Sequence, residues 1–306
     1  MITNTNMYNI TIIGAGICGL NLARLLKEKG RKNICILEKS NRIGGLIKTK
    51  HIEFKEKGKK KKVKYEAGGA VLFDYQKNMK DLVKKFNIDM IRMSLDNKGR
   101  HNKTFWDGTK RRRPMNQRTT DKYFSLLRKV FKYIEKMGDS YSRKYTLEQI
   151  CLKVLTFKET RFLEFCYGYA AEFRIANAVV AKKNMENELF NSKKILFYKN
   201  GYEELIDSIY NSIKDDVDLH KNTTIQSFQQ KKGYIELITK SGKKIKTKKL
   251  VLAIPKEALL KMCDSFTDKE LELFQSVAPS SLTRVFAKYD MSKQQNHWMK
   301  DLQFST

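Results

Sequence analysis

The stretch that decides the fold is YNITIIGAGICGLNLARLLKEKGRKNICILE, residues 8–38, near the start of a chain of 306 residues. A β-branched run over 8–13 ends at the glycine-rich segment 14–19. An apolar helical pattern then continues to Gly30, and a second short apolar run ends at Glu38. The segment therefore predicts a strand, a helix and a second strand of one parallel α/β sheet.

Three glycines with the spacing G-x-G-x-x-G lie between the first strand and the helix. Gly14 permits a tight turn, Gly16 lets the backbone approach a pyrophosphate, and Gly19 allows the helix to pack closely on the strand. The helix N-terminus then offers N–H groups to the diphosphate. Glu38, at the end of the second strand, is placed to accept hydrogen bonds from ribose hydroxyls. We predict dinucleotide binding; the alternative is a glycine-rich turn without a ligand.

FAD-binding and NAD-binding proteins share this glycine fingerprint, so the residues after Glu38 are needed to distinguish the two cofactors. Arg42 follows four residues later, and then the pair Gly44 and Gly45. This arrangement resembles the flavin-containing amine oxidoreductase family, which includes monoamine and polyamine oxidases, protoporphyrinogen oxidases and carotenoid desaturases. The resemblance implies FAD as cofactor, with the glycine pair against its diphosphate and ribityl chain and Arg42 supplying charge. Leu46 replaces the Arg of many amine oxidases and is closer to the protoporphyrinogen oxidase and desaturase branch.

Further segments extend the resemblance over most of the chain. Residues 63–73 look like the family's extended strand and Gly-Ala turn beside the isoalloxazine ring, and residues 199–205 look like its Gly-led helix start. Residues 249–255 resemble the strand that rejoins the FAD domain. Ile225 is either a core residue or the family's adenine contact, and its place in the series favours the contact. The implied cofactor-binding residues are Gly14, Ala15, Gly16, Ile17, Cys18, Gly19, Glu38, Lys39, Arg42, Gly44, Gly45, Leu46, Gly68, Gly69, Ala70 and Ile225.

The interval 119–189 has apolar residues at three- and four-residue spacing and no proline, which predicts helices. In the family this interval belongs to a substrate domain inserted into the FAD domain. The expected fold is therefore α/β, a Rossmann-like FAD-binding domain with an inserted helical and mixed-sheet substrate domain. The expected parts are the FAD domain at 1–75 and 199–262, the largely helical substrate domain at 76–198, and the start of the substrate-domain sheet at 263–306. We expect the aromatic residues between 162 and 173 to be core rather than channel.

The reaction that the resemblance implies is flavin-dependent oxidation, with a hydride equivalent passing from a C–N or C–C bond to the flavin and on to dioxygen. In amine oxidases a lysine near the flavin lies on a strand that residues 281–289 resemble, with Trp298 as its aromatic marker. In the favoured alignment Arg284 stands at the position of this lysine. If the strand is shifted in register, Lys288 stands there instead. The third interpretation is that the residue is only a solvated basic side chain without a catalytic role. The histidines lack metal-ligand spacing, so we expect no metal.

The chain carries 62 Lys and Arg against 33 Asp and Glu, a net charge of +29. Such a charge attracts polyanions. The favoured interpretation is lysine spread over exposed faces, because the clusters at 59–62 and 111–113 lie in expected loops and no nucleic-acid module accompanies them. Nucleic acid is thus not an expected partner, and a peripheral membrane contact is left open. Five scattered cysteines and the lack of a signal peptide or an 18-residue apolar run predict a cytoplasmic protein.

Members of the family continue past the point where this sequence stops. We therefore expect that a continuation of the chain or a second polypeptide supplies the rest of the flavin-binding site. The alternative is that the chain is a degenerate relative of the family. Three function classes follow from these features. The prediction is an FAD-dependent oxidoreductase of a small organic substrate, an amine or a large apolar molecule; the alternatives are an inactive nucleotide-binding interaction protein and a basic polyanion-binding protein.

Overall fold

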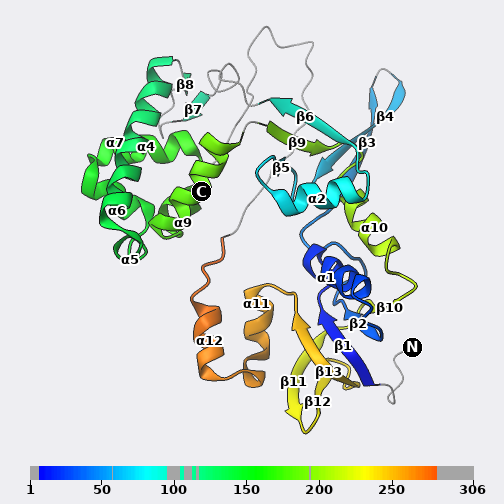
Figure 1. Ribbon diagram of the computed structural model, residues 1–306. Coiled ribbons are helices and arrows are strands. Elements are labelled where there is room, and N and C mark those ends of the chain that lie inside the picture. Colours follow the sequence, from blue (N-terminus) through cyan, green and yellow to red (C-terminus); the bar gives the residue numbers. More distant parts are fainter. Residues whose placement is uncertain are drawn as a thin grey trace. The chain divides into compact units, whose positions relative to one another are not determined.

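The computed structural model shows two compact units, drawn in Figure 1. Of the described residues, the sheet unit contains those up to Leu72 and those within 76–91 and 196–279, and the helical unit contains 73–75 and those within 92–195. The structure describes residues 7–56, 58–94, 104–106, 112–114, 117–192 and 194–280.

A six-stranded sheet forms the centre of the sheet unit, in the order β10-β2-β1-β13-β12-β11 (Figure 1). The first four strands are parallel, and β12 and β11 continue the sheet as antiparallel neighbours. Helix α1 (Ile17–Glu28) joins β1 to β2, as the sequence predicted. The strands are β1 (Met7–Ile13), β2 (Ile34–Leu37), β10 (Val217–His220), β11 (Ile225–Lys231), β12 (Tyr234–Thr239) and β13 (Lys244–Leu252). The predicted α/β fold class is confirmed.

Alternate residues of the central strands enter two different cores, because successive side chains of a strand point to opposite faces. Ile12 and Ile36 join Leu20 of α1 and Leu205 of α10 (Glu203–Asn211) in one core. Ile13 and Leu37 join Ile225 and Met262 in the other. This second face is covered by α11 (Lys256–Leu259) and the 3-10 segment Leu260–Ser265, against which α12 (Asp268–Gln275) packs.

Two segments that the sequence analysis placed in the substrate domain pack within the sheet unit. Leu82 of α2 (Lys77–Lys85) and Ile88 belong to the same core as α1. Phe266, just before α12, packs its ring on Phe228 of β11 at a centroid distance of 5.3 Å. Two smaller groups of strands are the hairpin β3 (Thr49–Glu56) and β4 (Lys59–Glu66), and the three-stranded sheet β5 (Leu72–Phe73), β9 (Lys194–Tyr198) and β6 (Met90–Ser94). The functional boundaries inferred from the sequence stay a prediction.

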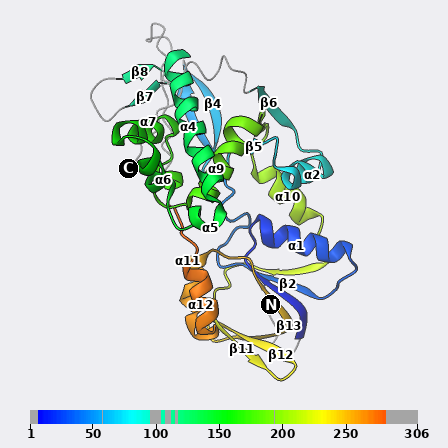
Figure 2. The same ribbon diagram turned by 60° about the vertical axis from the view of Figure 1, so that its left-hand side comes forward.

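The helical unit packs around the long helix α4 (Gln117–Met137), which lies among α6, α7 and α9 in Figure 2. Its predicted apolar stripe is buried at Leu127, Val130 and Ile134. Thr146 and Thr156 begin α6 and α7 with capping boxes that satisfy the first N–H groups of each helix. The other elements are β7 (Thr104–Trp106), β8 (Arg112–Pro114), α5 (Asp139–Ser142), α6 (Leu147–Val154), α7 (Phe157–Tyr167), α8 (Ala170–Arg174), α9 (Ala178–Glu186) and the π-helical turn Asn187–Asn191.

Phe173 and Tyr167 are buried in this core, as expected for the aromatic set, whereas Tyr169 is 42% exposed. Among the helices that the structure describes, none is both long and apolar enough to cross a bilayer.

Two buried tyrosines of this core differ in how their hydroxyls are satisfied. Tyr167 donates to Glu188 Oε2 over 2.9 Å, whereas the Tyr123 hydroxyl has no hydrogen-bond partner among the described residues. Because a buried polar group without a partner costs free energy, we expect Tyr123→Phe to keep or raise the free energy of unfolding, by up to about 1 kcal/mol. Tyr167→Phe should lower it by about 2 kcal/mol. Urea unfolding of both variants checks this, and a larger loss in Tyr123→Phe would contradict it.

Candidate functional site

The glycines of the first loop serve different structural roles. A Cβ on Gly14, whose φ is +105°, would lie 2.5 Å from the Ala253 carbonyl oxygen, and one on Gly19 would lie 2.0 Å from the Gly14 carbonyl oxygen. The chain's own packing therefore requires both glycines. A Cβ on Gly16 would find only Gly45 Cα, at 3.9 Å, among the described atoms within 4 Å. The space beside Gly16 is open, as the close approach of a ligand requires.

The N-terminus of α1 lies directly behind this open space. Gly16 is the N-cap residue and has an extended backbone, and no side chain in the described part of the chain caps the helix. The first turn contains Ile17, Cys18 and Gly19 and no acidic residue; Cys18 is exposed and Ile17 is half-buried. Uncapped N–H groups and the positive end of the helix dipole favour an anion here. The diphosphate of a dinucleotide is such an anion.

A second glycine loop meets the first one. The Gly44 amide donates to the Ala15 carbonyl oxygen over 2.8 Å, and Gly16 and Gly44 form an isolated parallel bridge. A Cβ on Gly45, whose φ is +59°, would lie 3.2 Å from Gly16 Cα. The structure thus brings together the two glycine segments that the sequence assigned to the cofactor's diphosphate.

The Arg42 side chain binds backbone carbonyl oxygens within the second glycine loop. Its Nη1 donates to the carbonyl oxygens of Ile43 and Ile47 over 3.0 and 3.1 Å. Its Nη2 donates to the carbonyl oxygen of Gly45 over 2.5 Å. Arg42 therefore positions the glycine pair, a role that the sequence did not reveal. A direct charge contact between Arg42 and the cofactor stays a prediction.

We expect Arg42→Lys to weaken FAD binding about tenfold, because a single ammonium cannot hold three carbonyl oxygens in the planar fork geometry of a guanidinium. Titration of the variant with FAD measures this loss. Arg31→Lys, at an exposed site, is the matched control and should bind as the wild type does. Wild-type affinity in Arg42→Lys would show that the loop needs no such closure.

Glu38 lies at the carboxyl end of β2 and is 8% exposed. Its Oε2 accepts the Ala15 amide over 2.9 Å, and its Oε1 accepts the Ser40 amide over 2.9 Å and the Ser40 hydroxyl over 2.8 Å. A carboxylate offers about four lone-pair positions, so the described donors leave room for one hydroxyl on Oε2. Glu38 is therefore placed to accept one ribose hydroxyl. Ser40, which orients the Glu38 carboxylate, was not among the predicted residues. The signal in the sequence that could have found it is a hydroxyl residue two positions after Glu38.

Gly68 and Gly69 lie against the segment after the glycine pair. A Cβ on Gly68 would overlap the Leu46 carbonyl oxygen at 1.5 Å, and the Gly69 amide donates to that same oxygen over 3.3 Å. The Leu46 side chain is 89% exposed, Lys39 is exposed and Ala70 is half-buried. Hence Gly68 and Gly69 lie beside the loop that contains Gly44 and Gly45. Position 68 must be a glycine because a side chain there would overlap the Leu46 carbonyl oxygen.

A partly buried hydrogen-bond network joins strands β3 and β4 to the start of α10. The Glu66 carboxylate accepts the Thr49 hydroxyl and the Tyr202 amide, each over about 3 Å. Thr49 in turn accepts the Glu203 amide over 3.1 Å. A Cβ on Gly201 would lie 2.5 Å from Thr49 Cγ2. Thr49 and Glu66 were not among the predicted site residues, although Glu66 stands just before the Gly68–Gly69 pair.

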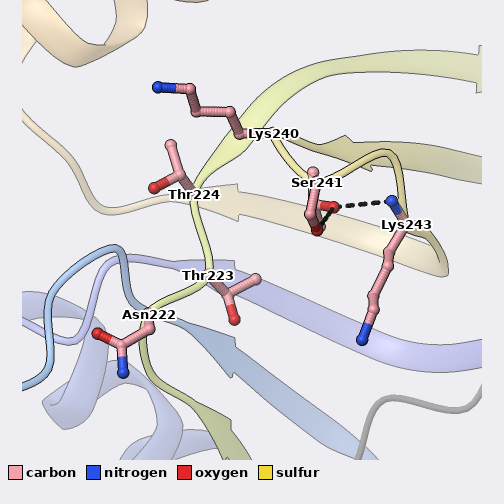
Figure 3. A pocket seen from close by; sticks show the side chains of 7 residues that line it. Asn222, Thr223, Thr224, Lys240, Ser241 and Lys243 are labelled. Atoms are coloured by element: carbon pink, nitrogen blue, oxygen red, sulfur yellow. Dashed lines mark hydrogen bonds between the residues drawn. The ribbon is translucent and has the colours of Figure 1, made fainter.

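A polar cavity of about 380 Å³ lies next to the Glu38 turn (Figure 3). Thr223 donates its amide to the Glu38 carbonyl oxygen over 2.8 Å, and Asn222 donates to that of Ser40 over 3.0 Å. The cavity is lined by Asn222, Thr223, Thr224, Thr239, Lys240, Ser241 and Lys243. The ammonium groups of Lys240 and Lys243 point in different directions in Figure 3, so they do not form one anion site. Ile225 follows this wall and is buried in the sheet core at 8% exposure.

The predicted flavin-proximal strand 281–289 lies outside the described residues, and with it Arg284 and Lys288. The marker Trp298 also lies outside them. The adenine contact of Ile225 and the cofactor contacts of Lys39 and Ala70 stay predictions.

Known proteins show the same architecture. Putrescine oxidase with bound putrescine superposes with a TM-score of 0.66 at 14% identity, covering 88% of this chain and 63% of that one. A single-site variant of that enzyme superposes at 0.68 with the same identity and coverage. A flavin-containing amine oxidase of Oncorhynchus mykiss is 33% identical over 93 residues, which are 30% of this chain and 16% of the relative.

This chain therefore spans less than two thirds of each of these relatives. The family model described as flavin containing amine oxidoreductase matches residues 17–303. The match confirms the predicted family and FAD as its cofactor. The chain belongs to the flavin-containing amine oxidoreductase family.

Proposed function

We propose that this chain binds FAD in its sheet unit and takes part in the FAD-dependent oxidation of an amine. The observation that carries the proposal is the open space beside Gly16, between an uncapped helix N-terminus and the Gly44–Gly45 loop. No contact within the described chain requires a glycine at this position. A glycine is what the close approach of a diphosphate needs.

The described residues fit the diphosphate and the adenosine ribose of FAD. Backbone N–H groups of α1 would bind the diphosphate, and Glu38 would accept a ribose hydroxyl. Arg42 and the Glu66 network hold the surrounding loops in place, so the site is preorganised. When bound, FAD supplies the acceptor for a hydride equivalent taken from a C–N bond.

We propose a primary aliphatic amine as the first substrate class and dioxygen as the final acceptor. One of the matched structures holds putrescine, which supports the substrate class. Dehydrogenation of a larger apolar molecule is the competing chemistry, because Leu46 follows the glycine pair in place of an arginine. Arg284 is proposed at the position of the flavin-proximal lysine.

Anaerobic mixing tests this proposal. The purified chain is loaded with FAD and mixed with putrescine, benzylamine or protoporphyrinogen while the absorbance of oxidised flavin is followed. We expect an amine to bleach the flavin, Arg284→Ala to slow the bleaching, and air to restore the oxidised spectrum. Bleaching by protoporphyrinogen alone would assign the chain to the other branch, and a loaded chain that no substrate reduces would contradict the enzymatic role.

A further inference from the structure

The β3–β4 hairpin has one face attached to the sheet unit. On this face, Thr49 pairs with Glu66 and His51 pairs with Lys64 across the two strands. The Lys64 ammonium donates to the carbonyl oxygens of Tyr198 and Lys199, and Thr49 and Glu66 bind the start of α10. Because side chains alternate between the faces of a strand, the residues between these positions point the other way.

The opposite face of the hairpin carries aliphatic side chains into solvent. Ile52 and Val63 are direct cross-strand partners, and their exposed fractions are 48% and 51%. Phe54, on the same face by register, is half-buried. A hairpin that is attached through Thr49, Glu66 and Lys64 while it exposes a paired Ile and Val reverses the usual pattern of a half-buried sheet. An exposed aliphatic pair of this kind indicates a contact surface.

The same hairpin is strongly basic. Residues 50–64 contain eight lysines against two glutamates. Lys50, Lys59 and Lys61 share the face of Ile52 and Val63 by register and are exposed, whereas Lys55, Lys60 and Lys62 lie on the opposite face. Lysine ammonium groups are attracted to a surface of anionic headgroups, and aliphatic side chains gain free energy by entering the boundary between headgroups and acyl chains. The two features occur together on one short element.

We propose that the β3–β4 hairpin binds the surface of an anionic lipid bilayer, with Ile52 and Val63 entering the acyl boundary and the surrounding lysines contacting the headgroups. Charge complementarity selects an anionic partner. The aliphatic pair favours lipid over nucleic acid. Proteins bind nucleic acid by stacking bases on aromatic rings and by hydrogen bonds to phosphates and bases, and Ile52 and Val63 can do neither. The inference is independent of FAD binding.

Flotation of the full chain with vesicles tests this proposal. Vesicles of phosphatidylcholine with about one-quarter phosphatidylserine should carry the protein, and pure phosphatidylcholine vesicles should not. The triple variant Lys50→Gln, Lys59→Gln and Lys61→Gln removes the lysines on the face of Ile52 and Val63. It should bind about a hundredfold more weakly, since each juxtamembrane lysine contributes roughly a fivefold factor. The matched control removes Lys231, Lys232 and Lys248, which are exposed on the central sheet, and should keep most of the binding.

A second pair of variants separates insertion from charge attraction alone. Ile52→Ser with Val63→Ser leaves every charge in place and should weaken vesicle binding at least about tenfold. The Ile52→Trp variant should show a blue-shifted emission with anionic vesicles that brominated lipid quenches. Unchanged circular dichroism spectra of all variants exclude unfolding as the cause.

Several outcomes would overturn the proposal. These are no flotation with anionic vesicles, equal loss in the control triple variant, and full binding by the Ile52→Ser, Val63→Ser protein. Binding of duplex RNA or DNA that depends on the hairpin while vesicles do not bind would assign the surface to nucleic acid. A dimer in light scattering that the same variants dissociate would assign it to a second copy of the chain.

Discussion

Gly19→Ala is expected to lower the free energy of unfolding of the sheet unit by about 3 kcal/mol, because a methyl group placed 2.0 Å from the Gly14 carbonyl oxygen must push α1 away from β1. The contact is with backbone, which cannot rotate aside as a side chain can. The displaced helix would carry its N–H groups away from the diphosphate position, so FAD binding should be lost as well. Urea unfolding followed by circular dichroism measures the change in stability.

Gly16→Ala is the matched control for Gly19→Ala in the same loop. Its methyl group enters open space, and Gly16 has a negative φ of −73° that alanine adopts readily. We expect the stability of the chain without FAD to stay within about 0.5 kcal/mol of wild type, while FAD affinity falls. An equal loss in the free energy of unfolding in both variants would show that the loop has no space for a methyl group at either position. Gly16 would then be required by packing and not by a ligand.

Glu38→Ala should raise the dissociation constant of FAD by roughly fivefold to 150-fold, which corresponds to the loss of about 1–3 kcal/mol for a charge-assisted hydrogen bond. Part of this loss would be structural, since the Glu38 carboxylate also accepts the Ala15 and Ser40 amides. Glu38→Gln keeps the shape and one acceptor oxygen, so it should bind FAD more tightly than Glu38→Ala does.

Ser40→Ala separates orientation from recognition. It removes one hydroxyl donor to Glu38 Oε1 and leaves Oε2 for the ribose, so we expect only a small loss of FAD affinity. FAD titration of the three variants, with their unfolding curves measured without FAD, makes the comparison. Unchanged FAD affinity in Glu38→Ala would remove Glu38 from the site.

The features that the sequence predicted well are local in the chain. The strands β1 and β2, the helix between them, and the roles of Gly14 and Gly19 all follow from neighbouring residues. The parallel pairing of β13 with β1 could be predicted only through the family resemblance, because more than 230 residues separate the two strands.

The features that escaped prediction depend on contacts between distant segments. Arg42 was expected to contact the cofactor, but the carbonyl oxygens it binds become neighbours only after the 43–47 loop has folded. Glu66 binds both Thr49 and Tyr202, and 136 residues of sequence separate Glu66 from Tyr202. The lysine cluster at 59–62 was expected in a loop, yet it forms the strand β4, because cross-strand pairing with β3 outweighs the low strand propensity of lysine.

Titration of the purified chain with FAD, followed by flavin fluorescence and absorbance, tests the central claim most directly. We predict saturable binding of one FAD per chain that Gly16→Ala weakens without loss of fold. A folded chain that shows no saturable FAD binding, or one whose affinity for FAD is the same in Gly16→Ala and Glu38→Ala as in the wild type, would contradict the account.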